Sequence, residues 1–139
     1  MKVNFLIAEE IRPEIGNKLT VLGLYPGDII IMLKGATPQG ASNGVSAGLE
    51  RLSILATISG ANDGLHKFKG RIVEPTGELY QPEAVFGEAV TRLGFSHTVL
   101  VELKPFVVKQ PGMFRFEFFV DDEMFTYQFE IREQHQAAS

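Results

Sequence analysis

The sequence predicts an all-β protein, an antiparallel immunoglobulin-like β-sandwich of about seven to eight strands, with at most one short helix near residues 82–92. Hydrophobic residues recur with a period of two along most of the chain, and turn-forming residues separate these segments at short intervals. The composition, 45% hydrophobic and 22% charged, is that of a globular protein. With 139 residues, we expect one domain over residues 1–133 and a flexible tail over residues 134–139. A closed β-barrel is the alternative.

The first two strands are expected over residues 3–7 and 19–25. Between them, Gly16-Asn17 is a turn dipeptide, so the simplest role of this stretch is to reverse the chain. The charged residues around the turn, including Arg12 and Lys18, then lie at strand ends in water. Opposite charges across such a hairpin contribute ~0.2–1 kcal/mol per pair.

The middle of the chain predicts a strand, a loop and a second hairpin. The continuous apolar run 29–33 indicates a strand that is covered on both faces or contacts a partner with its outer face. Residues 35–48 are small, polar and glycine-rich, which is typical of a loop. Alternation over 52–58 resumes after Asn62-Asp63-Gly64, whose residues tolerate positive φ, and this predicts the hairpin.

Alternation is clearest in the last third of the chain. Residues 95–103 predict a strand face that includes Phe95 and His97. The segments 113–120 and 125–131 alternate around an acidic tip and predict an antiparallel hairpin. Residues 82–93 predict a short helix that begins at Pro82. Because Gly87 in the middle disfavours a helix, extended structure is nearly as well supported.

Two motifs resemble those of a family of small bacterial proteins of unknown function. The first is EEIRPEIGNKLTVLGLYPG, residues 9–27, and the second is a Pro-Gly-x-Phe-x-Phe pattern at residues 111–116 followed by the acidic tip. The likeness extends from residue 5 to about 131, and it is loosest over 35–50 and 77–93. It implies an immunoglobulin-like sandwich and no catalytic residues, because the family has no established activity.

Charge and composition disfavour several function classes. A formal net charge of −4 argues against a general grip on nucleic-acid backbones, so we expect no nucleic-acid partner. The start lacks the features of a signal peptide, and no apolar run reaches the ~18 residues of a membrane span. We therefore expect no membrane insertion and a cytoplasmic location by default. The absence of cysteine removes disulfides and thiolate chemistry.

Catalytic signals are sparse. The three histidines, His66, His97 and His135, lie on different segments without metal-ligand spacing. A core histidine with satisfied hydrogen bonds is the simpler interpretation of His97, and a hydrolase or isomerase that uses it with a neighbouring carboxylate is the third functional hypothesis. We expect no enzyme activity and no cofactor.

The acidic tip offers a second hypothesis, a small-ligand or Ca²⁺ site at the hairpin tips. Asp121, Asp122 and Glu123 form this tip, and Asp63 would join them if both hairpins turned at the same end of the sandwich. A solvated turn is the simpler interpretation, because Ca²⁺ takes six to eight oxygen ligands.

The leading hypothesis is a non-catalytic interaction or structural module that binds a protein partner or a second copy of itself. Its evidence is a set of apolar residues in the outward phase of their strands. The expected interaction surface consists of Leu100, Phe119, Ile30 and Leu55, with Arg12 and Lys18 as charged candidates. Cover by residues 35–48 or 82–93 is the alternative for the apolar residues.

Overall fold

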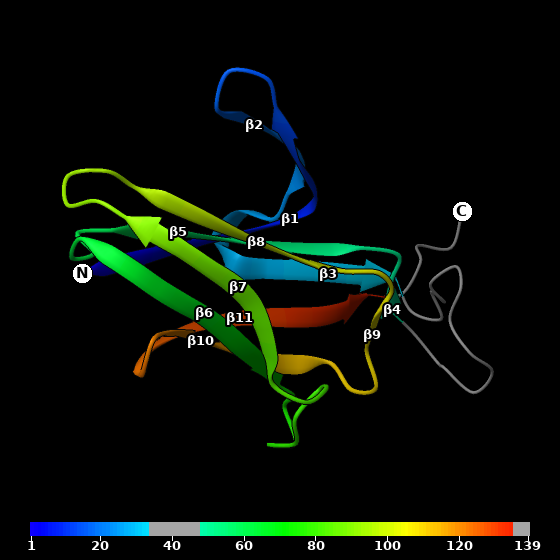
Figure 1. Ribbon diagram of the computed structural model, residues 1–139. Helices are drawn as coiled ribbons and strands as arrows, with labels where there is room; N and C mark the ends of the chain where they lie inside the picture. Colours follow the sequence, from blue (N-terminus) through cyan, green and yellow to red (C-terminus); the bar gives the residue numbers. More distant parts are fainter. Residues whose placement is uncertain (34–47, 135–139) are drawn as a thin grey trace.

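The computed structural model describes residues 1–33 and 48–134, and it is built from β-strands (Figure 1). The chain forms two main sheets that pack face to face as a sandwich. The strands are β1 (Lys2–Glu14), β2 (Lys18–Leu24), β3 (Ile29–Leu33), β4 (Gly48–Leu49), β5 (Leu52–Ser59), β6 (Gly64–Val73), β7 (Ala84–Thr91), β8 (His97–Leu103), β9 (Phe106–Val107), β10 (Gly112–Val120) and β11 (Glu123–Gln134).

The four-stranded sheet has the order β2-β1-β5-β8, and the five-stranded sheet has the order β3-β11-β10-β6-β7. Neighbouring strands are antiparallel except β3 and β11, which pair in parallel. A further short pair, β4 and β9, lies at one end. The predicted all-β class and the two-sheet packing are confirmed, whereas the parallel pair departs from the fully antiparallel prediction.

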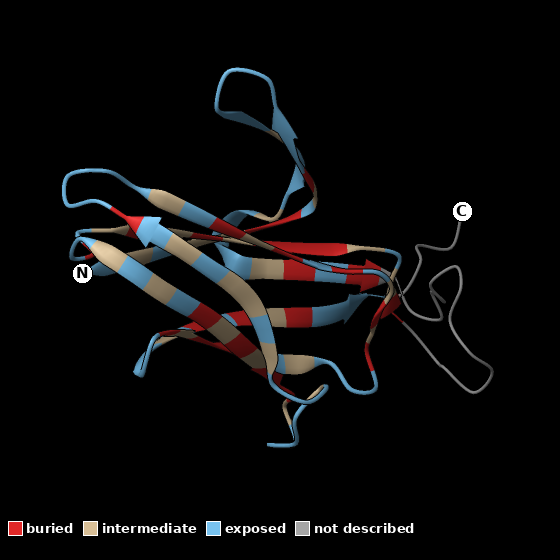
Figure 2. Cartoon of the chain, in the orientation of Figure 1, coloured by how far each residue is buried: buried red, intermediate tan, exposed pale blue. Residues whose placement is uncertain are grey.

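Phenylalanine side chains fill the space between the sheets. Phe114, Phe116 and Phe118 of β10 are at most 1% exposed, as their alternation predicts. Phe5 of the opposite sheet packs edge-on against Phe116, with ring centroids 5.9 Å apart. Figure 2 shows the resulting alternation of buried and exposed residues along the central strands. Such aromatic contacts add about 0.5–1.5 kcal/mol per pair to the hydrophobic effect.

The predicted hairpin over residues 113–131 is confirmed as β10–β11. The hairpin predicted around Asn62-Asp63-Gly64 is wrong, because β5 pairs with β1 and β8 in one sheet whereas β6 pairs with β10 and β7 in the other, so their connection crosses between the sheets. Residues 84–91 form β7, so the helical alternative for 82–92 is wrong. Phe95 precedes β8 and is exposed, so it does not belong to the strand face predicted over 95–103. Residues 34–47 and 135–139, which include most of the expected loop, His135 and the tail, lie outside the described residues.

The β1–β2 hairpin leaves the body of the sandwich. β1 pairs with β5 only as far as Ala8, and beyond that point it pairs with β2 alone. The turn is at Gly16-Asn17, as predicted, and both residues have positive φ. Figure 1 shows β2, with the end of β1 that it pairs with, projecting from the body of the sandwich. We call residues 9–25 the arm.

Within the described ranges 1–33 and 48–134, no helix has the length and hydropathy needed to cross a membrane. The one helical feature found there is a 3-10 turn at Pro26–Asp28, which joins the arm to β3.

Candidate functional site

Three leucines form a row across the outer face of the four-stranded sheet. Leu55 on β5 lies between Leu6 on β1 and Leu100 on β8, and both neighbours are its direct partners in the strand register. All three are half-buried. The structure therefore brings two predicted surface residues, Leu55 and Leu100, side by side and adds Leu6 to them.

The arm exposes large apolar side chains on both of its faces. Alternation places Leu19 and Val21 on one face of β2 and Leu22 and Leu24 on the other, and all four are exposed. Ile15, in the turn, is 95% exposed. Because the arm pairs with the body only at its base, no sheet formed by the described residues covers these side chains. Apolar surface of this kind marks contact sites.

A pocket of about 500 Å³ lies where the arm meets the body. Its apolar part consists of Leu22, Tyr25 and Leu49, and its charged part consists of Glu9, Glu10, Glu50, Arg51 and Lys104. The volume falls within the range of natural ligand pockets, roughly 300–1,000 Å³. The pocket therefore combines an apolar wall with a mixed rim in which acids outnumber bases.

Two interactions define the electrostatics of this pocket. Arg51 bridges two strands, with its guanidinium nitrogens 2.8 Å from Glu10 Oε1 and 3.6 Å from Glu102 Oε1. Burial, together with the nearby carboxylate of Glu9, raises the pKa of Tyr25 to about 12. The hydroxyl of Tyr25 therefore stays protonated at neutral pH.

The two predicted cations, Arg12 and Lys18, both belong to the arm. Arg12 Nε lies 3.6 Å from Glu10 Oε1 on the same strand. Lys18 begins β2 opposite Glu14 in the register. Exposed pairs of this kind contribute about 0–1 kcal/mol, so their main effect is to place charge along the arm.

Phe119 lies on the outer face of the opposite, five-stranded sheet, separated from Leu55 and Leu100 by the whole sandwich. Lys69 Nζ and Arg71 Cζ lie 5.2 and 5.4 Å from the centre of its ring, which is within the range of cation–π contacts. Phe119 is therefore half-buried beneath two cations and does not extend the leucine row.

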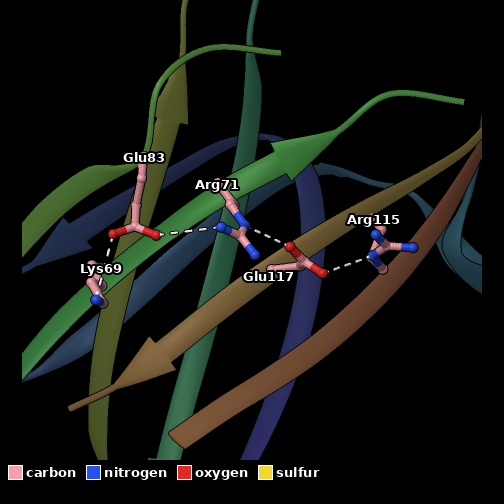
Figure 3. Close-up of polar contacts among 5 residues, drawn as sticks. All are labelled: Lys69, Arg71, Glu83, Arg115 and Glu117. Carbon is pink, nitrogen blue, oxygen red and sulfur yellow. Dashed lines mark hydrogen bonds and ion pairs between the residues drawn. The ribbon is translucent and has the colours of Figure 1, made fainter. Parts of the chain in front are cut away.

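A chain of ion pairs continues across this face (Figure 3). Glu83 contacts both Lys69 and Arg71, and Glu117 accepts hydrogen bonds from Arg71 Nε at 2.6 Å and Arg115 Nε at 3.0 Å. The Glu117 side chain is only 9% exposed. The hydrogen bond from Arg71 is the main reason that the pKa of Glu117 is lowered. The three cations and two carboxylates of this chain leave one excess positive charge.

Ile30 is fully buried and belongs to the core. The expectation that it contributes to an outer patch is therefore corrected. Parallel pairing with β11 turns Ile30 inward, whereas its neighbour Ile31 points outward and is 59% exposed. In a continuous apolar run, the sequence does not show which alternate residues face the core. The prediction placed Ile30 on the surface, whereas Ile31 is the exposed residue.

The β5–β6 connection and the β10–β11 turn meet at one end of the sandwich, but their carboxylates are directed to protein donors. Asp121 accepts a hydrogen bond from the backbone N–H of Lys67 and contacts His66 Nδ1 at 2.7 Å. Asp63 accepts a hydrogen bond from the backbone N–H of Leu93. Among the described residues, no group of three histidine or acidic side chains is arranged to hold a metal ion. Asp122 and Glu123 are exposed in the turn beside Asp121.

His97 is half-buried, and its ring stacks on Phe68 with centroids 5.4 Å apart. It lines a pocket of about 290 Å³ formed mainly by the β7–β8 connection. Over the described residues, this lining includes Arg92 and Ser96 but no carboxylate. The acid that the hydrolase hypothesis pairs with His97 is therefore missing from this pocket.

Sequence reasoning missed Leu6 and the apolar residues of β2. A signal was present for Leu6, because it lies in the phase opposite to Val3, Phe5 and Ile7. No such signal existed for Leu22 and the pocket, because alternation does not reveal that a hairpin leaves the sandwich.

A comparison with models of known protein families finds no match, and a comparison with curated proteins finds none either. Among solved structures, the chain is similar to the Pseudomonas fluorescens alkylpurine DNA glycosylase AlkC bound to DNA containing an abasic site analog, with a TM-score of 0.49 and 16% identity. The match covers 77% of this chain and 28% of that chain. A similarity this low says nothing about what this chain binds or catalyses.

Proposed function

We propose that this chain is a non-catalytic β-sandwich module that binds protein through its arm and the adjoining leucine row. The observation that carries the proposal is the exposure of apolar side chains on both faces of β2, an edge strand outside the sandwich. Burial of one large aliphatic side chain contributes about 1.5–3 kcal/mol. The arm is therefore a surface that gains stability when another protein covers it.

An edge strand adds backbone groups to this apolar surface. Among residues 1–33 and 48–134, no strand pairs with the free side of β2, and such an edge can accept a strand from another chain. The arm thus offers hydrogen bonds and apolar contacts together. Scattered apolar residues on a flat face would offer only the second.

We also propose that the sandwich is immunoglobulin-like. In that assignment β1, β5 and β8 are strands A, B and E, and β6, β10 and β11 are strands C, F and G. Support comes from the order of strands in the two sheets and from β7, which lies beside strand C as strand C′ does in variable-type domains. The parallel strand β3 extends the sheet beyond strand G.

The test compares Leu22→Asp, on the arm, with Phe119→Asp, on the opposite sheet. Both tagged variants and the wild type are used to capture proteins from the native host's lysate. Light scattering then gives the molar mass of each purified sample in solution. We expect Leu22→Asp to abolish specific capture or self-association. Phe119→Asp should retain it, because its ring lies beneath Lys69 and Arg71.

Far-UV circular dichroism and thermal melts serve as the control that both variants remain folded. Equal capture and equal mass for the wild type and a folded Leu22→Asp would overturn the proposal. Loss of binding in Phe119→Asp alone would move the interaction surface to the five-stranded sheet.

A further inference from the structure

We propose that the arm binds a second copy of this chain, through antiparallel pairing of β2 with β2 about a two-fold axis at Val21. This inference rests on the proposed function and names its partner. The two free edges would join into one continuous sheet in the order β1-β2-β2-β1. Closed two-fold assemblies are the commonest soluble oligomers.

β2 is a less protected sheet edge than β7 and β8. Edge strands that avoid association carry charges, prolines or bulges. β7 carries a bulge beside Phe68 of its partner strand and the charged residue Glu88, and β8 carries His97 and Glu102. β2 has the sequence KLTVLGL, whose one charged residue is the first. Its apolar residues are thus open to pairing along almost the whole strand.

Charge along the arm is complementary to itself in the antiparallel sense. Lys18 lies at the tip end of β2, and the pocket at the base has three acids, Glu9, Glu10 and Glu50, against the two bases Arg51 and Lys104. Glu9 lies directly over Gly23, near the end of β2. A two-fold axis at Val21 places Lys18 of each copy opposite Leu24 of the other, and so beside the acidic base. A parallel pairing would place Lys18 beside Lys18.

The turn of the arm exposes an apolar side chain, and the pocket at the base of the arm has an apolar wall. Ile15 lies in the turn next to Glu14, which pairs with Lys18, so antiparallel pairing carries the turn past Leu24 of the second copy. This places the turn near the pocket with the apolar wall of Leu22, Tyr25 and Leu49. Ile15, which is 95% exposed in the single chain, would be covered there.

The size of the surface fits a stable dimer. Stable interfaces use about 20–30 residues a side. The arm and the four pocket residues from the body, Leu49, Glu50, Arg51 and Lys104, give about 20 residues per copy, at the lower end of that range.

The test is a charge exchange measured by light scattering and sedimentation equilibrium, over about 1 to about 100 µM, which spans the expected range of dissociation constants. The wild type should show a mass about twice the 15.4 kDa of one chain. Lys18→Glu alone and Glu9→Lys alone should each weaken self-association about tenfold or more. An equimolar mixture of the two variants should restore it, because each contact again joins opposite charges.

Two further variants probe the edge of β2 and the exposed side chain of Ile15. Val21→Lys, at the axis, should give a monomer, and Ile15→Asp should weaken the dimer about tenfold or more. Val90→Lys, a similar change at an exposed position on the β7 edge, is the matched control and should leave the dimer unchanged. Ile15 lies in the turn, so Ile15→Asp tests the proposal even where Val21→Lys fails to fold.

The outcomes separate this inference from the proposed function. A wild type that is monomeric at about 100 µM overturns self-pairing. Self-pairing is also overturned if the dimer survives Val21→Lys and the mixture of the two charge variants fails to associate. A monomer that captures another protein through Leu22 rejects self-pairing and leaves the proposed function standing. A monomer without arm-dependent capture overturns both.

Discussion

His66 lies between two acceptors, with Nδ1 2.7 Å from Asp121 Oδ2 and Nε2 2.8 Å from the carbonyl oxygen of Asn62. A carbonyl and an ionised carboxylate can only accept, so both contacts are hydrogen bonds when both ring nitrogens donate, as they do in the protonated ring. Hydrogen bonds to these acceptors raise the pKa of His66, the one to Asn62 most, and the backbone N–H of Lys67 lowers the pKa of Asp121. The imidazolium thereby joins β6 to the β10–β11 turn.

This pair makes stability depend on pH. Because the folded pKa of His66 is raised, its contribution is complete below about pH 6.5 and is lost as pH rises through the folded value. Because the folded pKa of Asp121 is lowered, its contribution is complete above about pH 3.9 and is lost as pH falls through the folded value. The contribution is therefore greatest between these limits.

A double-mutant cycle with His66→Gln and Asp121→Asn measures the pair. We expect a coupling free energy of about 0.2–1 kcal/mol near pH 5, the range of surface ion pairs, and a smaller one near pH 9. Urea unfolding at both pH values gives the four free energies. A coupling that is equal at the two pH values would contradict a charged His66.

Glu117 is expected to matter more to stability than the other acid of its ion-pair chain. Glu117→Gln leaves Arg71 and Arg115 without their shared carboxylate and should lower the free energy of unfolding by about 1–3 kcal/mol. Glu83→Gln, at a more exposed pair, should change it by less than about 0.5 kcal/mol. Urea titrations at pH 7 measure both, and equal losses would show that the burial of Glu117 does not decide its contribution.

The Glu117 effect should also depend on pH in a defined direction. Its folded pKa is lowered, so its contribution is present above about pH 4.3 and is lost as pH falls through the folded value. The difference between wild type and Glu117→Gln should therefore shrink on acidification. A difference that grows below pH 4 would contradict this sign.

Gly70 occupies a position where a methyl group does not fit. A Cβ there would lie 2.8 Å from a ring carbon of Phe86 and 3.1 Å from the carbonyl oxygen of Glu117. Gly70→Ala should cost about 1–3 kcal/mol through overpacking. Combining it with Phe86→Leu, which removes the contacting ring, should cost less than the sum of the two single changes. Additive losses in chemical unfolding would exclude the steric explanation.

Tyr127 holds the segment that leads into β3. Its hydroxyl donates a hydrogen bond to Asp28, which has a positive φ of 59°, and burial raises the pKa of Tyr127. Tyr127→Phe should lower stability by about 1 kcal/mol and speed amide hydrogen exchange in β3. Tyr80→Phe, which instead removes the acceptor of the Val107 N–H, should leave exchange in β3 unchanged. Equal exchange in β3 for both variants would reject the role of Asp28.

Local patterns in the sequence determined the strands that could be predicted. Alternation and turn residues are properties of adjacent positions, so they identified the β10–β11 hairpin and the turn at Gly16-Asn17. The same patterns located strands at β5 and β6 but did not show that these strands join different sheets. They also identified the buried face of β10. The choice between helix and strand at residues 84–91 depended on pairing with β6, which is not a local property.

The candidate site was harder to predict because it depends on which sheet a strand joins. Alternation correctly placed Leu100 and Phe119 in the outward phase, but the two lie on opposite sheets. Nor does it show that β1 continues beyond its partner β5, which is the feature that creates the arm. His66 and Asp121 meet only because β6 pairs with β10, which places the start of β6 beside the β10–β11 turn.

The parallel pairing of β3 with β11 has a consequence for synthesis of the chain. Ile29 pairs with Glu130, and the strands β1, β5 and β8 of the other sheet are complete by Leu103. A nascent chain can therefore assemble most of the four-stranded sheet while β3 still lacks its neighbour, since translation proceeds from the N-terminus. Until Gln134 has left the ribosome, Ile30 has no finished core to enter, and this segment is one that a chaperone should find exposed.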